Sequence, residues 1–441
     1  MIETKNNGND WIAEIPAHWE VKRLKDVSYL YSGLTGKAGE DFTSEQDNRA
    51  KPYIPFTNVL NNSVINPMQM NYVYFAEGEV QNRVKLNDLI FLMSSEDYDS
   101  IGKSAVVLNE FNDVYLNSFC RGLRFTEKRI DSRFVNYLLN STPCRDSLRF
   151  EARGFTRINI KIEKIASQFI CYPPLDEQQA IADFLDKKTA EIDNQISLLE
   201  NKLQALIKLK KSLISEVISH GLDRAIEMKD SGINWIGKIP AHWEIKRMKD
   251  VSELYTGKSL NDSQKELYGD LSGADVLPYI GSKDVDATTG SVNYESGYAI
   301  PITHYGFPVA TKGSSLLCIE GGSAGKKIGQ VEKDVYFVNK LCCIKSRLNP
   351  KYIYFFLNSN LFSNQFNKNL QGMIGGVSVA LIKTFFITYP PLEEQQSIAN
   401  YLQRKCREID EQSSLINEKI ESYTRLKQSL IDEVVTGQRK I

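Results

Sequence analysis

The chain has 441 residues, of which 42% are hydrophobic and 25% are charged, and its formal net charge is −1. It is long enough for roughly three domains, and its near-neutral charge excludes a wholly basic nucleic-acid binder while leaving room for local basic patches. Because the sequence contains neither a membrane-spanning apolar run nor the apolar core of a signal peptide, we expect a cytoplasmic protein. The seven cysteines lack metal-ligand spacing, which argues against a zinc site and against a disulfide framework.

Near the start of the chain lies a distinctive decapeptide, WIAEIPAHWE at residues 11–20, which returns as WIGKIPAHWE at residues 235–244. All four tryptophans lie in these two copies, together with two of the four histidines. The similarity continues beyond the decapeptides, so that residues 11–33 and 235–257 agree at 17 of 23 positions. A repeat with this spacing predicts a duplicated unit of about 220 residues rather than a solenoid.

The middle of each unit, residues 18–172 and 242–389, contains short apolar runs such as DLIFLM at 88–93 and SSLLCIE at 314–320. Clusters of Gly, Asn, Asp and Ser separate these runs, a pattern typical of strands joined by turns. Helical segments follow late in each middle, in SRFVNYLLNS and KYIYFFLNSN. We therefore expect two α+β domains that share an apolar frame and differ in their loops, which suits two different binding sites.

A second repeated motif ends each middle domain, as YPPLDEQQAIADFL from Tyr172 and YPPLEEQQSIANYL from Tyr389. Two prolines followed by two acidic residues are typical of a helix start. Apolar residues then recur every seven positions, which predicts a long helix with one coiled-coil seam. The seam consists of Leu185, Ile192, Leu199, Leu206 and Leu213 in the first helix and of Leu402, Ile409, Ile416, Tyr423 and Leu430 in the second.

A lone helix with one apolar seam would leave that seam exposed, so we expect the two helices to pair as an antiparallel coiled coil. The alternative is that each helix lies on its own domain. Lys210 and Lys427 interrupt the seam, which leaves the packing near them unpredicted.

These features divide the chain into a first domain at 1–172, a helical region at 173–220, a linker and second docking segment at 221–241, a second domain at 242–389 and a final helical region at 390–441.

The antiparallel pairing also offers a reason for the repeated decapeptide. Each copy begins a unit and would lie beside the end of the other unit's helix. We interpret it as a docking clasp between domain and helices, in preference to a catalytic site around His18 or His242.

Catalytic motifs are missing from the sequence. GKS at 102–104 and AGKK at 324–327 lack the upstream glycine of a phosphate-binding loop, and GxSxG, HExxH and Asn-Pro-Pro-aromatic motifs do not occur. This absence favours a binding protein over an enzyme.

Residues 101–161 hold eleven Lys or Arg against six Asp or Glu, and the prominent arginines suit bidentate contacts to phosphate and guanine.

Four features together resemble the specificity subunit of type I restriction–modification systems: the doubled decapeptide, the doubled PPLxEQQ motif, the heptad helix after each and the two dissimilar middle domains. The resemblance covers essentially the whole chain. It implies that each middle domain is a target recognition domain reading one half of a bipartite double-stranded DNA sequence, and that the coiled coil fixes the unread spacer. It also implies two modification subunits that bind S-adenosylmethionine and methylate adenine, and restriction subunits that use ATP and Mg²⁺. The chain itself would be non-catalytic and hold no cofactor or metal.

The expected DNA contacts lie in the loops where the two halves differ. A helix from 182 to 217 would be ~50 Å long and match roughly 15 base pairs of DNA, so that two domains at its ends could read sites about one helical turn of DNA apart.

Two other functions remain open, namely a coiled-coil scaffold that does not bind DNA, and a DNA methyltransferase or nuclease with degenerate motifs. The candidate DNA-binding residues are Lys37, Asn58, Ser94, Lys103, Arg153, Thr156 and Arg157 in the first domain and Lys258, Lys283, Lys326, Lys327 and Gln371 in the second.

Overall fold

The computed structural model describes residues 4–9, 12–44, 49–269, 273, 275–304, 306–370 and 375–441. The chain divides into two compact units, residues 1–199 with 418–441, and residues 200–417. Each unit therefore combines one middle domain with parts of both long helices. This grouping by contacts cuts through the helices, whereas the boundaries expected from the sequence fall where the helices begin.

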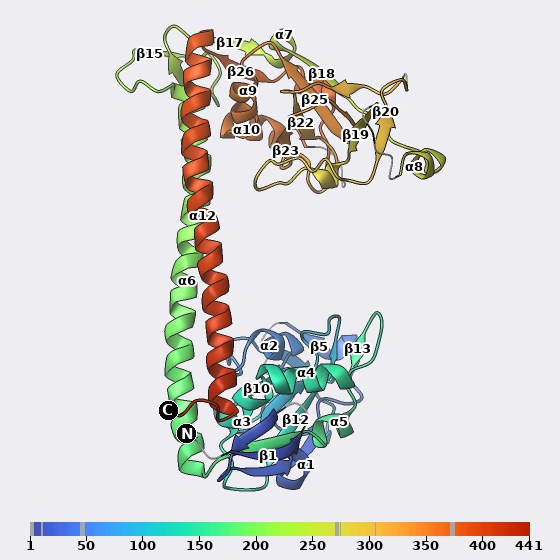
Figure 1. Ribbon diagram of the computed structural model, residues 1–441, viewed down its shortest axis with the longest axis vertical. Helices are drawn as coiled ribbons and strands as arrows, with labels where there is room; N and C mark the ends of the chain where they lie inside the picture. The colour runs from blue at the N-terminus through green and yellow to red at the C-terminus, as the bar shows by residue number, and fades with distance from the viewer. Residues whose placement is uncertain are drawn as a thin grey trace. The chain divides into compact units, whose positions relative to one another are not determined.

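In the first unit, two four-stranded sheets form the middle domain (Figure 1). One sheet is antiparallel, in the order β10 (Ser104–Val106), β8 (Leu89–Leu92), β12 (Cys120–Phe125), β4 (Ser28–Ser32). The other has the order β11 (Tyr115–Leu116), β6 (Ala50–Ile54), β7 (Asn71–Tyr74), β5 (Phe42–Thr43), and its β11–β6 pair is parallel. Strand β8 is buried on both faces, because Leu89 and Phe91 enter one hydrophobic cluster while Ile90 and Leu92 enter another.

Short helices and two-stranded pairings complete this domain. The helices are α1 (Leu24–Val27), α2 (Phe56–Asn61), α3 (Ser132–Leu139), α4 (Thr142–Glu151) and α5 (Ile162–Ala166), with a 3₁₀ turn η1 at Gly39–Asp41. The antiparallel pairs are β1 (Thr4–Asn9) with β2 (Ile12–Pro16), β3 (Glu20–Arg23) with β14 (Phe169–Tyr172), and β9 (Ser94–Ser95) with β13 (Ile158–Asn159).

The second unit repeats this frame. Its antiparallel sheet has the order β18 (Ser252–Thr256), β25 (Leu341–Ser346), β22 (Ser315–Cys318), β23 (Ile328–Gln330). Its mixed sheet has the order β20 (Ala299–Pro301), β19 (Val276–Ile280), β24 (Val335–Phe337), β21 (Val309–Ala310). The other elements are β15 (Met228–Asp230), β16 (Lys238–Pro240), β17 (Glu244–Arg247), α7 (Met248–Val251), α8 (Asp262–Tyr268), η2 (Ser282–Asp284), α9 (Pro350–Leu357), α10 (Asn360–Lys368), α11 (Val379–Ile382) and β26 (Phe386–Tyr389).

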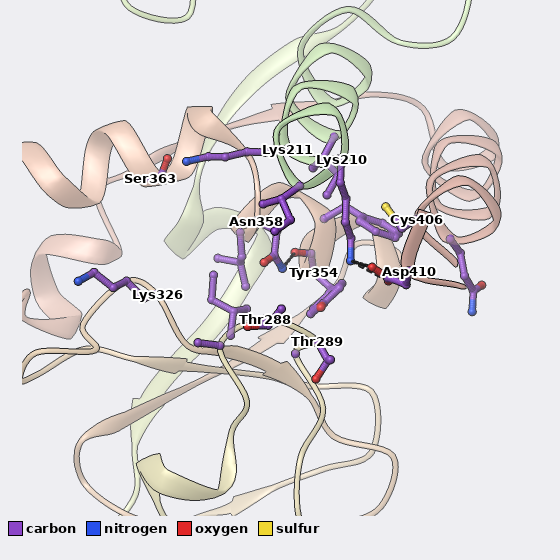
Figure 2. A pocket seen from close by; sticks show the side chains of 18 of the residues that line it. Lys210, Lys211, Thr288, Thr289, Lys326, Tyr354, Asn358, Ser363, Cys406 and Asp410 are labelled. Atoms are coloured by element: carbon purple, nitrogen blue, oxygen red, sulfur yellow. Dashed lines mark hydrogen bonds and ion pairs between the residues drawn. The ribbon is translucent and has the colours of Figure 1, made fainter. Parts of the chain in front are cut away.

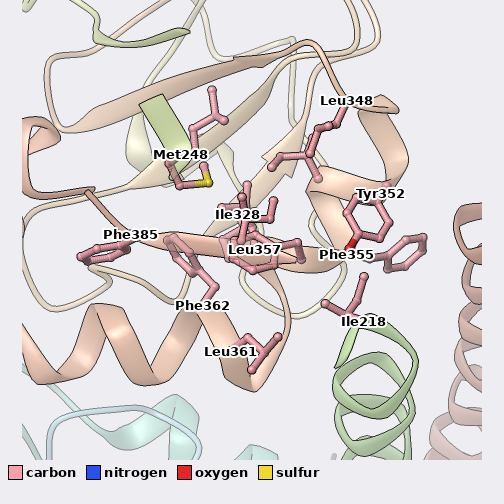
Figure 3. Packing of buried hydrophobic residues seen from close by; sticks show 14 of the residues in the cluster. Ile218, Met248, Ile328, Leu348, Tyr352, Phe355, Leu357, Leu361, Phe362 and Phe385 are labelled. Atoms are coloured by element: carbon pink, nitrogen blue, oxygen red, sulfur yellow. The ribbon is translucent and has the colours of Figure 1, made fainter. Parts of the chain in front are cut away.

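The core of the second unit extends from the sheet to the end of the first long helix (Figure 3). Helix α9 supplies Tyr352 and Phe355, and the fully buried Ile218 of the long helix belongs to the same hydrophobic cluster. Each fully buried side chain of this size contributes roughly 1.5–3 kcal/mol to the free energy of unfolding. The domain and this part of the helix therefore share one core, which fixes the helix against the domain.

The two long helices are α6 (Leu175–His220) and α12 (Leu392–Val435). In the first unit, Trp19 contacts Glu177 near the start of α6 and lies 3.4 Å from the position a Cβ would take on Gly437, just beyond the end of α12. Further along, Asp193 of α6 is paired with Lys427 of α12. Residue numbers rise along one helix as they fall along the other, so the two helices run antiparallel in this unit.

The second unit contains the opposite parts of the same helices. Trp243 contacts Glu394 near the start of α12 and lies 3.2 Å from the position of a Cβ on Gly221, just beyond the end of α6. Lys210 of α6 is paired with Asp410 of α12. The helices are antiparallel here as well, as the sequence predicts.

The burial pattern along both helices follows the predicted heptads. Leucines outside the seam are exposed: the exposed fraction is 62% for Leu198 and 58% for Leu415. A strip of positions spaced by seven residues is therefore the covered face, as in a coiled coil. Leu185, Ile192, Leu402, Ile409, Ile416 and Leu430 are buried, and Leu199, Leu206, Leu213 and Tyr423 are half-buried.

The two lysines that interrupt the seam form ion pairs across it. The Nζ atom of Lys427 lies 2.7 and 2.6 Å from the two carboxylate oxygens of Asp193, and the Nζ atom of Lys210 lies 2.7 Å from both oxygens of Asp410. The same pair thus occurs once in each unit, with the roles of α6 and α12 exchanged. A polar pair at one seam position selects one register among several apolar ones.

The decapeptide and the PPLxEQQ motif meet in each unit. The carboxylate of Glu177 accepts a hydrogen bond from the indole nitrogen of Trp19 at 3.2 Å and contacts Nε2 of His18 at 2.9 Å. The carboxylate of Glu394 contacts Trp243 at 2.8 Å and the ring of His242 in the same way. Both indoles are buried. The repeated decapeptide is therefore a clasp between domain and long helix, as expected, although Trp11 lies outside the described residues.

The first glutamine of each PPLxEQQ motif joins the helix start to the domain. Gln178 is fully buried, donates to the carbonyl oxygens of Pro173 and Arg129 at 2.9 Å, and accepts from the backbone N–H of Asp131. Asp131 is the residue whose side chain caps α3. Gln395 makes the equivalent bond to Asn349, which caps α9.

The clasp leaves no room for a side chain at the end of α12. Gly437 has φ +75°, and a Cβ there would lie 2.3 Å from Cδ of Pro16. We expect Gly437→Ala to lower the free energy of unfolding by roughly 1–2 kcal/mol through left-handed backbone strain and by about 1–3 kcal/mol more through overpacking. Urea unfolding of the full chain measures the sum.

Gly36→Ala is the matched control, because Gly36 has φ +70° and a Cβ there meets nothing within 4 Å. It should show the backbone strain alone. Equal losses for both variants would contradict the close packing of the α12 end against the clasp.

Candidate nucleic-acid interface

The arginines of the basic segment at 101–161 fall into two groups. Four of them are tied to carboxylates: Arg124 to Asp88, Arg129 to Glu127, Arg133 to Asp183 and Asp186, and Arg149 to Asp99 and Asp146. The other four, Arg121, Arg145, Arg153 and Arg157, take part in none of the ion pairs found among the described residues. Only this second group retains an uncompensated charge for an anionic ligand.

Arg153 and Arg157 flank the tip of a closed loop. Strands β9 and β13 pair antiparallel below it, and the backbones of Arg153 and Asn159 exchange hydrogen bonds of 3.0 and 2.9 Å across its base. Phe155 and Thr156 lie at the exposed tip. The guanidinium of Arg157 lies 4.4 Å from the ring centre of Phe119. Of the predicted DNA contacts, Ser94, Arg153, Thr156 and Arg157 are thus brought together by one short ribbon and its loop.

Lys103 lies apart from this loop, in the wall of a cavity of about 700 Å³. Burial and the nearby charge of Arg145 lower the pKa of Lys103, while its Nζ lies 3.4 Å from the carbonyl oxygen of Leu60. Burial, followed by repulsion from Arg149, lowers the pKa of Arg145 to about 10. Lys103 and Arg145 thus lie close together in the cavity wall, where Arg149 is already paired with Asp99 and Asp146.

The side chains of two predicted DNA contacts, Lys37 and Asn58, form their polar contacts within the first domain. The side chain of Lys37 is only 6% exposed and its ammonium is paired with Glu79 at 2.5 Å, a bond that holds the pKa of Glu79 down at about 2. Asn58 is fully buried, and its side chain donates to the carbonyl oxygens of Asn66 and Gln69. Because their polar atoms already stabilise loops of the domain, the geometry does not favour these two residues as DNA contacts, and their DNA contact stays a prediction.

The predicted contacts of the second domain occupy two places. Lys326 and Lys327 precede β23, and Nζ of Lys327 donates to the carbonyl oxygen of Ser282, beside the exposed Lys283. The Nζ atom of Lys258 lies instead 5.1 Å from the ring centre of Phe307. Gln371 falls outside the described residues.

A cavity of about 710 Å³ in the second unit contains Lys326 in its wall (Figure 2). The paired Lys210 and Asp410 line it from the two long helices, and Asn358 lines it from the end of α9. The cavity of the first unit has the same construction, with Lys427, Asp193 and Asn140 in these three roles. Each unit therefore has a cavity, with an ion pair in its wall, where its domain meets the helix pair.

The sequence analysis missed these cavity walls. Asn140 and Asn358 occupy equivalent positions in the two repeats, directly after α3 and α9. Aligning the helical segments SRFVNYLLNS at 132–141 and PKYIYFFLNS at 350–359 position by position would have matched them. Their position beside the long helices, however, depends on tertiary packing alone.

Comparison with known proteins agrees with this architecture. The family model described as "Type I restriction modification DNA specificity domain" matches the chain twice, at residues 16–208 and 240–422. The type I restriction enzyme MjaVIII specificity subunit of Methanocaldococcus jannaschii is 23% identical, over 97% of this chain and 94% of that protein. The EcoKI specificity subunit of Escherichia coli K12 is 22% identical, over 96% and 90%.

A solved structure shares the fold. It comes from work titled "Structural basis underlying complex assembly and conformational transition of the type I R-M system". The TM-score is 0.70 at 16% identity, with 96% of this chain and 99% of that chain covered. Two matches to the family model, over most of the chain and in the two repeats that the sequence predicts, leave one conclusion. The chain belongs to the family of type I restriction–modification DNA specificity subunits.

Proposed function

We propose that this specificity subunit reads a DNA sequence in two parts, one with each middle domain, and that the helix pair sets the distance between the parts. The observation that carries this proposal is the double occurrence of one set of contacts. The Trp–Glu clasp, the buried glutamine and the Lys–Asp pair hold each domain to the helices in the same way. Two domains that are attached to the helices by the same contacts but carry different loops suit two different half-sites.

The partners follow from the same proposal. Specificity subunits are non-catalytic, so the reaction would belong to two modification subunits that bind S-adenosylmethionine and methylate adenine. Restriction subunits that use ATP and Mg²⁺ would join the same complex. This chain would contribute the DNA contacts and the frame, and would hold none of these cofactors itself.

Reconstitution tests the division of labour. The isolated chain should transfer no methyl group from S-adenosylmethionine and should cut no DNA, whereas the chain mixed with its modification subunits should methylate adenine at one sequence. Methylation is measured by sequencing a plasmid library after the reaction. Turnover by the chain alone would contradict the proposal, as would methylation without sequence preference in the complete complex.

Arg157 should contribute to DNA binding and Lys37 should not. Arg157 is exposed and outside the ion pairs of the described residues, so Arg157→Ala should reduce the slope of log affinity against log salt by about one unit if it contacts a phosphate. If it contacts a base edge, discrimination at one position should fall by about 1–3 kcal/mol. Salt titrations of the complex on duplex DNA measure both quantities.

Lys37→Met is the control, because it removes a charge that is already paired within the domain. It should lower stability without changing the salt slope. A slope change for Lys37→Met and none for Arg157→Ala would place the DNA-binding face elsewhere on the domain.

The two half-site specificities should be separable. Replacing residues 258–388 with the equivalent segment of another member of the family keeps both clasps and both helices. The methylated sequence should then change in one half only, with an unchanged spacer. Sequencing the methylated genome of cells that carry the chimera gives this result directly. A change in both halves, or in the spacer, would show that the domains are not independent readers.

A further inference from the structure

The most exposed aromatic side chain of the described residues is Phe155, at 99%. It is not an isolated surface residue, because three more exposed aromatic rings adjoin the same loop: Phe150, Tyr98 and Phe119. Tyr98 donates a hydrogen bond to the carbonyl oxygen of Gly154, and Arg153 lies over the ring of Phe150. We call residues 153–157 the aromatic loop. Burial of a phenylalanine is favourable, and a cluster of exposed aromatic rings on one surface is typical of a site that a ligand covers.

The backbone of the aromatic loop is held in one shape. Gly154 has φ +149°, and a Cβ on it would lie 2.0 Å from the carbonyl oxygen of Arg157. The side chain of Asn159 donates to that same oxygen at 3.2 Å, and the Arg153–Asn159 bonds close the base. Only glycine fits at position 154. The backbone that carries Phe155 is therefore held in one conformation, so the aromatic loop loses little conformational entropy when a ligand covers the ring.

The charges beside the ring indicate which ligand that is. Arg153 and Arg157 flank Phe155, and no ion pair among the described residues involves either. Arg153 donates to the carbonyl oxygen of Ala152, and Arg157 lies over Phe119, so both guanidinium groups are oriented but keep their net charge. Of the carboxylates that follow β9, Asp97 accepts hydrogen bonds from Ser100 and Asp99 is paired with Arg149, while Glu96 forms none of the ion pairs found among the described residues. An apolar ring between two free cations is complementary to stacked bases between two phosphates.

We propose that Phe155 inserts as an apolar wedge at a base step of the half-site bound by the first domain, while Arg153 and Arg157 bind phosphates on either side. This rests on the proposed function only in that duplex DNA is the ligand. The phosphate contacts and the burial of the ring would offset the free-energy cost of unstacking one base step. The wedge makes recognition depend on how easily the step deforms, since flexible pyrimidine–purine steps open at lower cost.

The test uses the full chain with its modification subunits and duplexes carrying the methylated target sequence. The adenine analogue 2-aminopurine, placed in turn at positions of the first half-site, fluoresces when its neighbour unstacks. The unmodified protein should raise the fluorescence at one step. Phe155→Ala should abolish that rise and weaken specific binding about tenfold or more, and Phe155→Leu should retain part of both.

Met68→Ala is the matched control, because Met68 is an 89% exposed apolar residue of the same unit that adjoins no such loop. It should leave both signals unchanged. Unchanged fluorescence and affinity in Phe155→Ala would overturn the wedge while leaving DNA reading intact. Loss of modification-subunit assembly in Phe155→Ala would also overturn it, and would assign the ring to a protein contact. If the unmodified complex bound no DNA sequence preferentially, the proposed function itself would fail.

Discussion

One buried indole in each unit holds the parts of that unit together. Trp19 and Trp243 are enclosed by their own domain, by the start of one long helix and by the end of the other. A buried indole N–H must find an acceptor, and a carboxylate in the first turn of a helix also interacts favourably with the helix dipole. Glu177 and Glu394 satisfy both conditions. Because the indole lies against Gly437 or Gly221, larger residues are excluded from these helix ends.

The helix pair adds a second constraint, on register. Apolar heptads alone would tolerate a shift by whole heptads, but the Lys427–Asp193 and Lys210–Asp410 pairs are satisfied in one alignment only. These pairs are half-exposed, so their value lies in selecting that alignment more than in stability. Both pairs also line the cavities beside the domains. The residues that set the register thus lie in the cavity walls where each domain meets the helix pair.

The domains use their frames and loops differently. Frame residues recur in both repeats and are buried, while the aromatic loop and the loops around Lys283 and Lys326 have their own compositions. Specificity in such a protein depends on the loops, because side chains there are free to vary without disturbing the core. Two of the four unpaired arginines of the first domain, Arg153 and Arg157, lie on such a loop, whereas the corresponding loops of the second domain carry lysines, so the two domains would contact DNA through different cationic groups.

The sequence by itself determined the duplication, the α+β class, the seam of the long helices and the family, because repeats and heptads are periodic in the chain and need no knowledge of distant contacts. Arg153, Thr156 and Arg157 lie on one loop because they are neighbours in sequence, and their contact with DNA stays a prediction. Only the tertiary structure decided which charges remain free. Lys37 and Arg124 look like Arg157 in the sequence, yet Glu79 and Asp88, distant along the chain, neutralise them. The full exposure of Phe155 was equally unpredictable from the sequence, because exposure depends on what the rest of the fold leaves uncovered.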